Sequence, residues 1–299
     1  MPLRLEGTYT ALVTPFREAP DQPIDWEALD GLIDVQIAAR VAGLVPCGTT
    51  GESPTLSHEE HARVVERTVE RAGGRAQVVA GAGSNSTREA VALSQHAERV
   101  GADAVMVVVP YYNKPTQEGL VRHFVEVAKS VRLPVVVYNI PGRTGIDLAP
   151  ETLARICALA PNVVAIKEAT GNVIRAQRIV QTMGERVVVL SGDDALTLPM
   201  IAVGARGVIS VTSNVLPAEI VRATALALGG TLEEARREHL ALLPVHDAMF
   251  LEASPGPVKA ALALRGLIRD VVRSPLCPPT EATRSAIQSA LDAFARGGR

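Results

Sequence analysis

The sequence predicts an α/β fold, a (β/α)8 TIM barrel with a C-terminal three-helix extension. Short apolar runs alternate with amphipathic stretches of helical length over most of the chain. The runs are apolar on both faces, and strands of this kind, each followed by a helix, form parallel sheets. Eight such units within about 225 residues suit a closed barrel, whose usual size is about 250 residues.

Eight strands and eight helices are predicted in alternating order. The strands are predicted at residues 8–13, 43–46, 77–80, 104–109, 135–138, 163–167, 187–190 and 207–211. The helices are predicted at residues 26–40, 58–72, 87–100, 117–131, 150–160, 173–183, 195–203 and 217–228. Two helix starts carry capping signals, because Asp25 precedes the first helix, and Ser57 with Glu60 makes a capping box before the second.

A doubly wound open sheet is the competing architecture. Its nucleotide-binding fingerprint is missing, because the stretch Gly81-Ala82-Gly83-Ser84-Asn85-Ser86 lacks the third glycine of G-x-G-x-x-G. A phosphate-binding loop of the G-x-x-x-x-G-K-[ST] type is also missing. The barrel is therefore the favoured prediction.

The pattern changes after residue 228, where two glycines interrupt the chain. Three helical stretches follow at residues 232–252, 258–268 and 281–295, separated by proline-rich breaks at 254–257 and 274–279. We therefore expect two parts, a barrel over residues 1–228 and a helical extension over residues 229–299.

Composition limits the kinds of partner. The chain has 299 residues, a net charge of -2 and 47% hydrophobic residues, and it carries no run of basic residues that would suit nucleic acid. No apolar run reaches membrane-spanning length, and the N-terminus lacks the apolar core of a signal peptide. Its three cysteines are too few and too scattered for a disulfide framework. These features predict a cytoplasmic protein without nucleic-acid or membrane partners.

Lys167 stands near the end of the sixth predicted strand, where a lysine is unexpected. Removing an ammonium from water is costly, so a buried lysine tends to lose its proton. A neutral lysine is a nucleophile, and its usual use is a Schiff base with a carbonyl substrate. The alternative for this residue alone is a strand-end lysine that extends to solvent.

Other strand ends supply groups that fit this chemistry, because TIM barrels place their active sites at the C-terminal ends of the strands. Thr49 and Thr50 follow the second strand between glycines, where backbone amides and hydroxyls suit a carboxylate, although a plain turn is the alternative. Tyr111 and Tyr112 follow the fourth strand. A phenol can relay protons, although a core tyrosine with a satisfied hydroxyl is equally expected at each position alone.

The remaining strand ends add an arginine and two acids. Tyr138 ends the fifth strand and Arg143 follows it, and a guanidinium can grip a carboxylate with two hydrogen bonds. Asp193 and Asp194 follow the seventh strand, where helix capping explains them as well as a substrate contact does.

No metal site is predicted from these residues. His58 and His61 lie one turn apart, but His58-Glu59-Glu60-His61 is not the zinc-binding His-Glu-x-x-His pattern, and a solvated helix face explains the pair. The residues alone predict a lyase or aldolase of class I, without metal or cofactor, that acts on a 2-oxo acid through a Schiff base.

Five motifs, in the same order along the chain, resemble the dihydrodipicolinate synthase / N-acetylneuraminate lyase family. The resemblance covers essentially the whole chain and is specific through the joint order of the motifs. They are Gly48-Thr49-Thr50-Gly51-Glu52, Tyr111-Tyr112-Asn113, Tyr138-Asn139-Ile140-Pro141-Gly142-Arg143-Thr144, Ile166-Lys167-Glu168-Ala169-Thr170-Gly171-Asn172 and Leu190-Ser191-Gly192-Asp193-Asp194.

The resemblance implies condensation of pyruvate with L-aspartate 4-semialdehyde, in the diaminopimelate route of lysine biosynthesis. It implies that Lys167 forms the Schiff base with pyruvate and that no cofactor takes part. Tyr138, Thr49 and Tyr112 match the family's proton relay, with Tyr112 supplied by a neighbouring subunit of a homotetramer built as a dimer of dimers. The substrate-binding positions implied are Thr50 for the pyruvate carboxylate, Arg143 for the semialdehyde carboxylate, and the backbone carbonyls of Gly192 and Ile209.

The resemblance also implies an allosteric site for L-lysine as a feedback inhibitor. The matching positions are Ser53, His58, His61, Asn85, Glu89 and Tyr111. Glu89 would pair with the α-ammonium of the ligand, and Tyr111 and Asn85 would bind its carboxylate. Pro54 stands where the family often has a small residue, which would alter the entrance to this site.

Two alternatives remain on the sequence. Sister aldolases and lyases, such as N-acetylneuraminate lyase or a 2-keto-3-deoxy sugar acid aldolase, share the barrel and the lysine, and Thr50 with Arg143 argues against them. A non-catalytic ligand sensor is the second alternative, and the presence of Lys167, Tyr138 and Arg143 argues against it.

Overall fold

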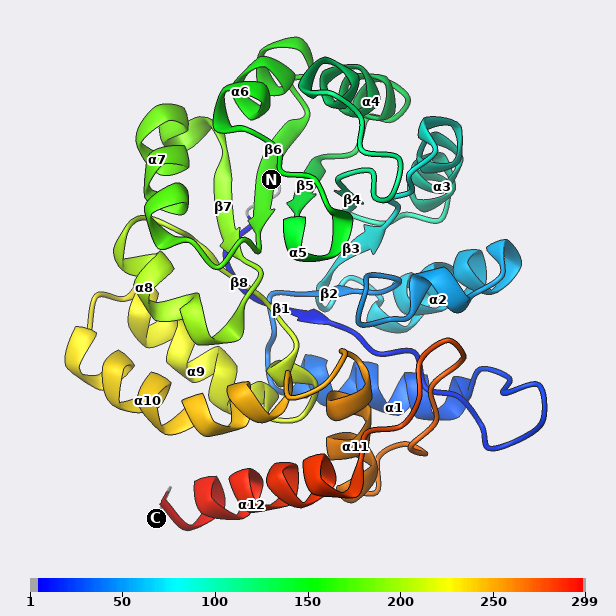
Figure 1. Cartoon of the computed structure of the whole chain (residues 1–299), viewed down its shortest axis with the longest axis vertical. Coiled ribbons are helices and arrows are strands. Elements are labelled where there is room, and N and C mark those ends of the chain that lie inside the picture. The colour runs from blue at the N-terminus through cyan, green and yellow to red at the C-terminus, as the bar shows by residue number, and fades with distance from the viewer. Residues whose placement is uncertain (1–4, 298–299) are drawn as a thin grey trace.

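The computed structural model describes residues 5–297. Eight parallel strands form a barrel in the order β1 to β8, which is closed because β1 pairs with both β2 and β8 (Figure 1). The predicted (β/α)8 barrel is thereby confirmed. The strands are β1 (Gly7–Ala11), β2 (Gly43–Val45), β3 (Gln77–Gly81), β4 (Ala104–Val108), β5 (Val135–Asn139), β6 (Val163–Glu168), β7 (Val188–Ser191) and β8 (Gly207–Ser210).

Helices surround the barrel and follow the strands in order. They are α1 (Trp26–Ala38), α2 (His58–Ala72), α3 (Thr87–Arg99), α4 (Gln117–Lys129), α5 (Pro141–Thr144), α6 (Pro150–Leu159), α7 (Val173–Met183), α8 (Thr197–Ala202) and α9 (Pro217–Leu228). Short 3-10 turns lie at η1 (Ser53–Thr55), η2 (Gly184–Arg186), η3 (Asp194–Leu196) and η4 (Thr212–Asn214). Both predicted caps form, since Asp25 accepts a hydrogen bond from the amide of Ala28, and Ser57 and Glu60 make the capping box.

The extension consists of α10 (Leu232–Ala248), α11 (Gly256–Leu264) and α12 (Glu281–Gly297). Helix α10 contacts α9 and α12, and α11 contacts α12 and the turn η4 after the last strand. Figure 1 shows the three helices together on one side of the barrel. Among the described residues, no helix has both the length and the apolar character to cross a membrane.

The structure differs from the prediction in three places. The sequence 195–203 begins with the 3-10 turn η3, and Asp193 caps that turn through the amide of Ala195. The short helix α5 was not predicted, and it starts at Pro141, whose missing amide suits a first helical position. In the extension, the helix predicted at 232–252 begins at Leu232 as predicted but ends at Ala248, and the helix predicted at 258–268 is shifted to Gly256–Leu264. Pro257 also fits a first turn, so α11 begins inside the proline-rich break.

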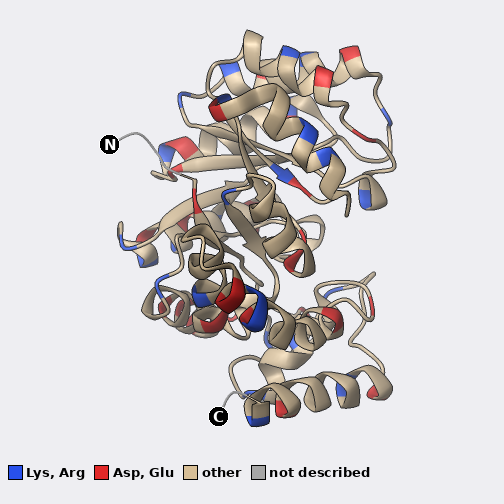
Figure 2. Cartoon of the chain, turned by 90° about the vertical axis from the view of Figure 1, so that its left-hand side faces the viewer, with Lys and Arg blue, Asp and Glu red and all other residues tan. Residues whose placement is uncertain are grey.

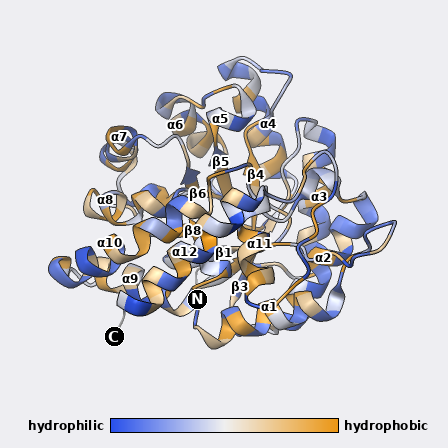
Figure 3. Ribbon diagram, turned by 60° about the horizontal axis from the view of Figure 1, so that its bottom comes forward, coloured by the Kyte–Doolittle hydropathy of each residue, from blue (hydrophilic) through white to orange (hydrophobic). Residues whose placement is uncertain are grey.

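Two apolar layers hold the barrel together. The inner layer fills the barrel with side chains that include Tyr9, Val79, Met106 and Leu190, and a larger layer packs between the strands and the surrounding helices. Figure 3 shows the hydrophobic colour concentrated on the strands and on the helix sides that face them. In the view of Figure 2, acidic and basic residues are intermixed over the helices. The filled interior leaves room for a site only at the strand ends.

Candidate active site

Lys167 and Tyr138 lie side by side at the C-terminal end of the barrel. They are register partners on β6 and β5, so both side chains leave the sheet on the same face. Ala165 and Val136, two positions earlier on the same strands, belong to the inner layer, so this face is the barrel interior. The Nζ atom of Lys167 lies 4.2 Å from the centroid of the Tyr138 ring.

Lys167 is only 5% exposed, so the alternative of a lysine extending to solvent is excluded. Within residues 5–297, no ion pair or hydrogen bond is formed by its Nζ atom. A Cβ at Gly192 would lie 3.1 Å from Cε of Lys167 and 2.6 Å from Cβ of Ala169. Glycine at this position therefore leaves the space that the lysine chain occupies. Ile209 of β8 is buried in the same inner layer.

Glu168, the next residue on β6, faces the other way and anchors the strand end. Its carboxylate accepts hydrogen bonds from Nε of Arg175 at 3.0 Å and from the amide of Thr170 at 2.8 Å. Arg175 also pairs with Asp147 at 3.0 Å, and Asp147 accepts a hydrogen bond from Asn139 of β5 at 2.8 Å. This network was not found from the sequence. Strand alternation was the available signal, because it predicts that Glu168 faces away from Lys167.

The loop after β2 brings Thr49 to the same end of the barrel. The loop is a tight turn in which the amides of Gly51 and Ser53 donate to the carbonyl of Gly48, at 3.1 and 3.3 Å. Thr14 fixes it from the neighbouring loop, since its hydroxyl donates to the carbonyl of Gly51 at 2.7 Å. Thr50, in contrast to Thr49, is buried beneath the surface of the loop.

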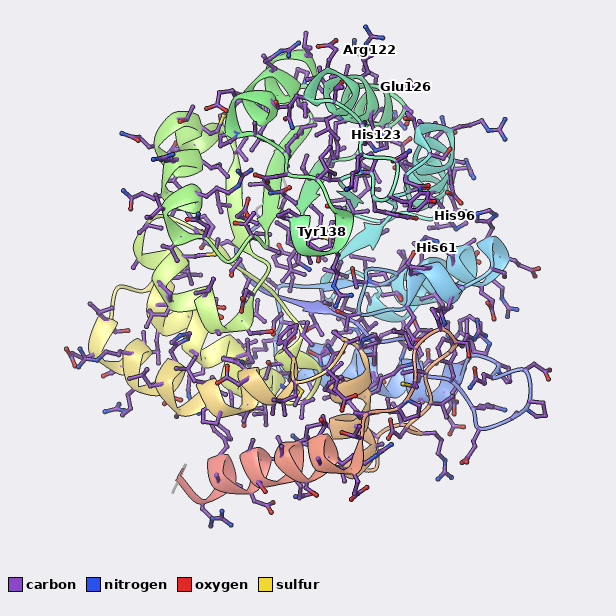
Figure 4. The ribbon with its side chains drawn as sticks, in the orientation of Figure 1. His61, His96, Arg122, His123, Glu126 and Tyr138 are labelled. Atoms are coloured by element: carbon purple, nitrogen blue, oxygen red, sulfur yellow. The ribbon has the colours of Figure 1, made fainter. Side chains whose placement is uncertain are left out.

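A single cavity of about 440 Å³ joins the strand ends to the start of α2 and α3. Figure 4 labels Tyr138 at the centre of the barrel and His61 farther out, on α2. Eight of the predicted site residues line this cavity, namely Thr49, Tyr138, Arg143, Ser53, His58, His61, Glu89 and Tyr111. Among the described residues, the predicted residues outside its lining are Lys167, Thr50, Gly192, Ile209, Asn85 and Tyr112.

The outer end of the cavity is polar. Glu89 bonds both Nε2 of His58 and the hydroxyl of Ser84, and these bonds, with Ser84 the larger contributor, lower the pKa of Glu89. His58 is exposed, as a solvated helix face predicts, but His61 is buried, and this burial lowers its pKa to about 4. Ser84 and Cys47 also line the cavity and were not predicted. Their positions after β3 and β2 were the available signal.

Tyr112 lies apart from the other site residues. It is 88% exposed, and its backbone has a φ of 71°, in the left-handed region. Its amide donates to the carbonyl of Thr144 at 3.4 Å, which ties the loop to α5. In a single chain this side chain therefore lies at the surface, outside the lining of the cavity to which Tyr138 belongs.

No cluster of three or more potential metal ligands occurs within residues 5–297. The chemistry that the described residues support is nucleophilic attack by an amine in an apolar, enclosed site, with a phenol and a hydroxyl nearby for proton transfer. Arg143 adds a cation to the lining of the cavity.

Comparison with known proteins agrees with this geometry. A 4-hydroxy-tetrahydrodipicolinate synthase of Sorangium cellulosum (strain So ce56) is 56% identical over 290 residues, 97% of this chain and 96% of the relative. A chloride-inhibited dihydrodipicolinate synthase from Acinetobacter baumannii, complexed with pyruvate, is 40% identical with a TM-score of 0.95, over 98% of this chain and 99% of the other. The enzyme from Cyanidioschyzon merolae with lysine bound is 38% identical with a TM-score of 0.94, over 97% and 98%.

A family model describes the same relationship over almost the whole chain. The match extends over residues 4–294, which include every motif at the strand ends and two of the three helices of the extension in full. This chain belongs to the dihydrodipicolinate synthetase family.

Proposed function

We propose that this protein is a 4-hydroxy-tetrahydrodipicolinate synthase, which condenses pyruvate with L-aspartate 4-semialdehyde in the diaminopimelate route of lysine biosynthesis. The observation that carries the proposal is the enclosed Lys167, whose Nζ atom lies over the Tyr138 ring with no ion pair within residues 5–297. An amine in that setting is available for attack on a carbonyl carbon. The relatives named as synthases share the fold and more than a third of the sequence.

In the proposed mechanism, the lone pair on Nζ of Lys167 attacks C2 of pyruvate, and loss of water gives the imine. Removal of a methyl proton gives the enamine, whose carbon attacks the aldehyde carbon of the semialdehyde. The amino group of that substrate then displaces Lys167 as the ring closes. Tyr138 and Thr49, which both line the cavity, carry the protons that these steps release and consume.

We assign substrate binding to four residues, of which Arg143 lines the cavity. Arg143 receives the carboxylate of the semialdehyde, because this residue lines the cavity and a guanidinium can form two parallel hydrogen bonds with a carboxylate. Thr50 receives the carboxylate of pyruvate in the loop after β2. We also assign the backbone carbonyls of Gly192 and Ile209 to the pocket around the lysine, and the close approach of Gly192 to Cε supports this for Gly192.

Tyr112 is proposed to complete the proton relay of a neighbouring subunit in a homotetramer built as a dimer of dimers. Its exposure supports this role, because a large aromatic side chain that is 88% exposed is available to a partner. Tyr112→Phe should slow turnover while the fold is retained. Unchanged turnover in this variant would contradict the relay role.

We propose that L-lysine binds the outer end of the cavity as a feedback inhibitor, between Ser53, His58, His61, Asn85, Glu89 and Tyr111. The carboxylate of Glu89 supports this site, because it is available to an α-ammonium once His58 moves aside. Isothermal titration calorimetry that detects no binding at millimolar L-lysine would overturn it. The cytoplasm is the proposed location, and the three cysteines, all free in the described chain, suit its reducing conditions.

The test supplies both substrates and follows the product through a coupled reductase with NADPH, with and without L-lysine. Turnover that falls when L-lysine is added supports the synthase and the allosteric site together. Turnover without any effect of L-lysine keeps the synthase and rejects the allosteric site. Absent turnover calls for borohydride trapping with pyruvate, in which an adduct on Lys167 identifies a sister aldolase or lyase and its absence a non-catalytic protein.

A further inference from the structure

A second buried lysine joins the loop after β2 to the C-terminal extension. Lys259 of α11 and Glu52, three residues after Thr49, form an ion pair whose two side chains are both 0% exposed. The partners lie 207 residues apart in sequence. The Nζ atom of Lys259 also donates to the carbonyl of Val271 at 2.8 Å.

Both oxygens of the Glu52 carboxylate are held by the extension. Oε1 accepts from Nζ of Lys259, and Oε2 accepts from the backbone amide of Arg273 at 3.0 Å. The guanidinium of Arg273 reaches the carboxylate of Glu60 on α2, at 2.6 and 2.7 Å. The end of the loop is thus fixed from two directions by residues outside the barrel.

Glu52 has a backbone conformation that is unfavourable for any residue with a side chain. Its φ is 54° and its ψ is 37°, in the left-handed region, where a residue with a Cβ is strained. In this conformation its amide donates to the carbonyl of Thr49 at 3.1 Å. The ion pair therefore maintains the turn that presents Thr49 to the cavity.

We propose that Glu52 and Lys259 are positioning residues, through which the extension fixes the Thr49 hydroxyl for proton transfer in the reaction of Lys167. The proposal rests on the proposed function, because it assigns Thr49 to that reaction. Neither residue of the pair lines the cavity, so their effect on the reaction passes through the loop.

Stability alone is a poor reason for such a pair. Desolvation of two charges offsets most of their attraction, and well-packed neutral replacements of similar volume are often as stable. A neutral pair lacks the directional, charge-assisted bonds that fix both oxygens of Glu52. The ion pair is thus explained by the geometry that it imposes on the turn.

A double-mutant cycle tests the proposal in the full-length protein. The paired replacement Glu52→Gln with Lys259→Met leaves no unpaired charge, and it is made with Thr49 present and in a Thr49→Val background. With Thr49 present, we expect the paired replacement to lower kcat about tenfold and to change KM for pyruvate by less than about twofold. In the Thr49→Val background, we expect the paired replacement to cause no further loss of kcat. The proposal would be overturned if the paired replacement lowered kcat by the same factor in both backgrounds, or if it caused no loss of kcat with Thr49 present.

Three further measurements keep the result interpretable. If the paired replacement does not fold, as judged by circular dichroism, Glu52→Gln alone enters the same cycle, because glutamine keeps the shape and an accepting oxygen. Arg284→Gln is the matched control, since it breaks the Arg284–Asp270 ion pair of the extension without touching the loop, and kcat should not change. If the wild-type protein lacks synthase turnover, the proposed function fails by itself, and the cycle is then measured on the rate of borohydride-trapped pyruvate adduct.

Discussion

Two buried lysines in this chain have similar surroundings and different partners. Lys167 lies with Nζ 4.2 Å from the ring centroid of Tyr138, and Lys259 lies with Nζ 4.1 Å from that of Phe16. Both side chains are shielded from solvent. Lys259 faces the carboxylate of Glu52, whereas no acid pairs with Lys167 within residues 5–297.

The difference implies that burial alone is not sufficient for the proposed role of Lys167 as a nucleophile. Burial lowers the pKa of Lys259 to about 8, while the charge of Glu52 opposes that shift. At neutral pH the ion-paired ammonium of Lys259 has no lone pair to offer. The site around Lys167 has the apolar enclosure without the acid, and it adds a phenolic hydroxyl that Phe16 lacks.

The largest expected effect comes from removing the proposed nucleophile. Lys167→Ala should lower kcat by on the order of 10⁴-fold or more, because no other group can form the imine. Mass spectrometry after borohydride reduction with pyruvate should detect no adduct. Lys259→Met is the matched control, and its folded fraction should still form the adduct. A reduced adduct on Lys259 in the wild-type protein would reverse the assignment of the two lysines.

The next largest effect is expected from removing the hydroxyl of Tyr138 while its aromatic ring is kept. Tyr138→Phe makes the surroundings of Lys167 resemble those of Lys259, since both amines then lie over a phenyl ring. We expect kcat to fall by roughly 10²- to 10⁴-fold, the usual contribution of general acid–base catalysis, with little change in Tm. Stopped-flow measurement of turnover, alongside thermal unfolding, gives the result. Activity within twofold of the wild-type value would exclude the relay role of the Tyr138 hydroxyl.

The local sequence pattern was sufficient to predict that Lys167 lies among other site residues at the C-terminal ends of the strands. Parallel strands end at one rim of a barrel, so residues at the ends of separate apolar runs are expected to meet. Tyr138, Lys167 and Gly192 were placed at that rim from the sequence, and in the structure Lys167 lies against both Tyr138 and Gly192.

The ion pair of Lys259 was not predicted, because no residue near Lys259 in the sequence identifies its partner. Glu52 and Lys259 are separated by 207 residues, and the pairing depends on how the extension packs against the loop. The same limit applies to Ser84 with Glu89 at the outer cavity, whose bond depends on a side-chain rotamer. Short-range periodicity carries no information on either contact.

The buried His123, whose Nδ1 atom lies 2.9 Å from the hydroxyl oxygen of Thr87, tests the rule that burial keeps a base neutral. Burial lowers the pKa of His123 to about 4, and its Nε2 atom has no hydrogen-bond partner in the described chain. The unfolded chain, with a pKa of about 6.5, binds more protons between pH 4 and 6.5, so the stability due to neutral His123 is present above pH 6.5 and lost as the pH falls. By pH 5 this loss should reach about 2 kcal/mol.

Urea unfolding at pH 7.5 and pH 5 measures that loss. His123→Gln cannot titrate, so its free energy of unfolding should depend less on pH than that of the wild-type protein, by about the same 2 kcal/mol. An NMR titration that finds His123 half-protonated near pH 6.5 would contradict the rule.

The smallest expected effect comes from the space around the Lys167 chain. A Cβ at Gly192 would lie 2.6 Å from Cβ of Ala169 and 3.1 Å from Cε of Lys167, so Gly192→Ala must push Ala169 away and also displace the lysine chain by a few tenths of an ångström. Misplacing a reacting group by a small distance costs rate, and we expect a loss of about tenfold in kcat. Gly256→Ala in α11, near Lys259, meets no atom closer than 3.5 Å and should leave kcat unchanged. Equal kcat for the two variants would mean that the lysine chain is not confined by Gly192, and that the lack of an acid partner alone distinguishes Lys167 from Lys259.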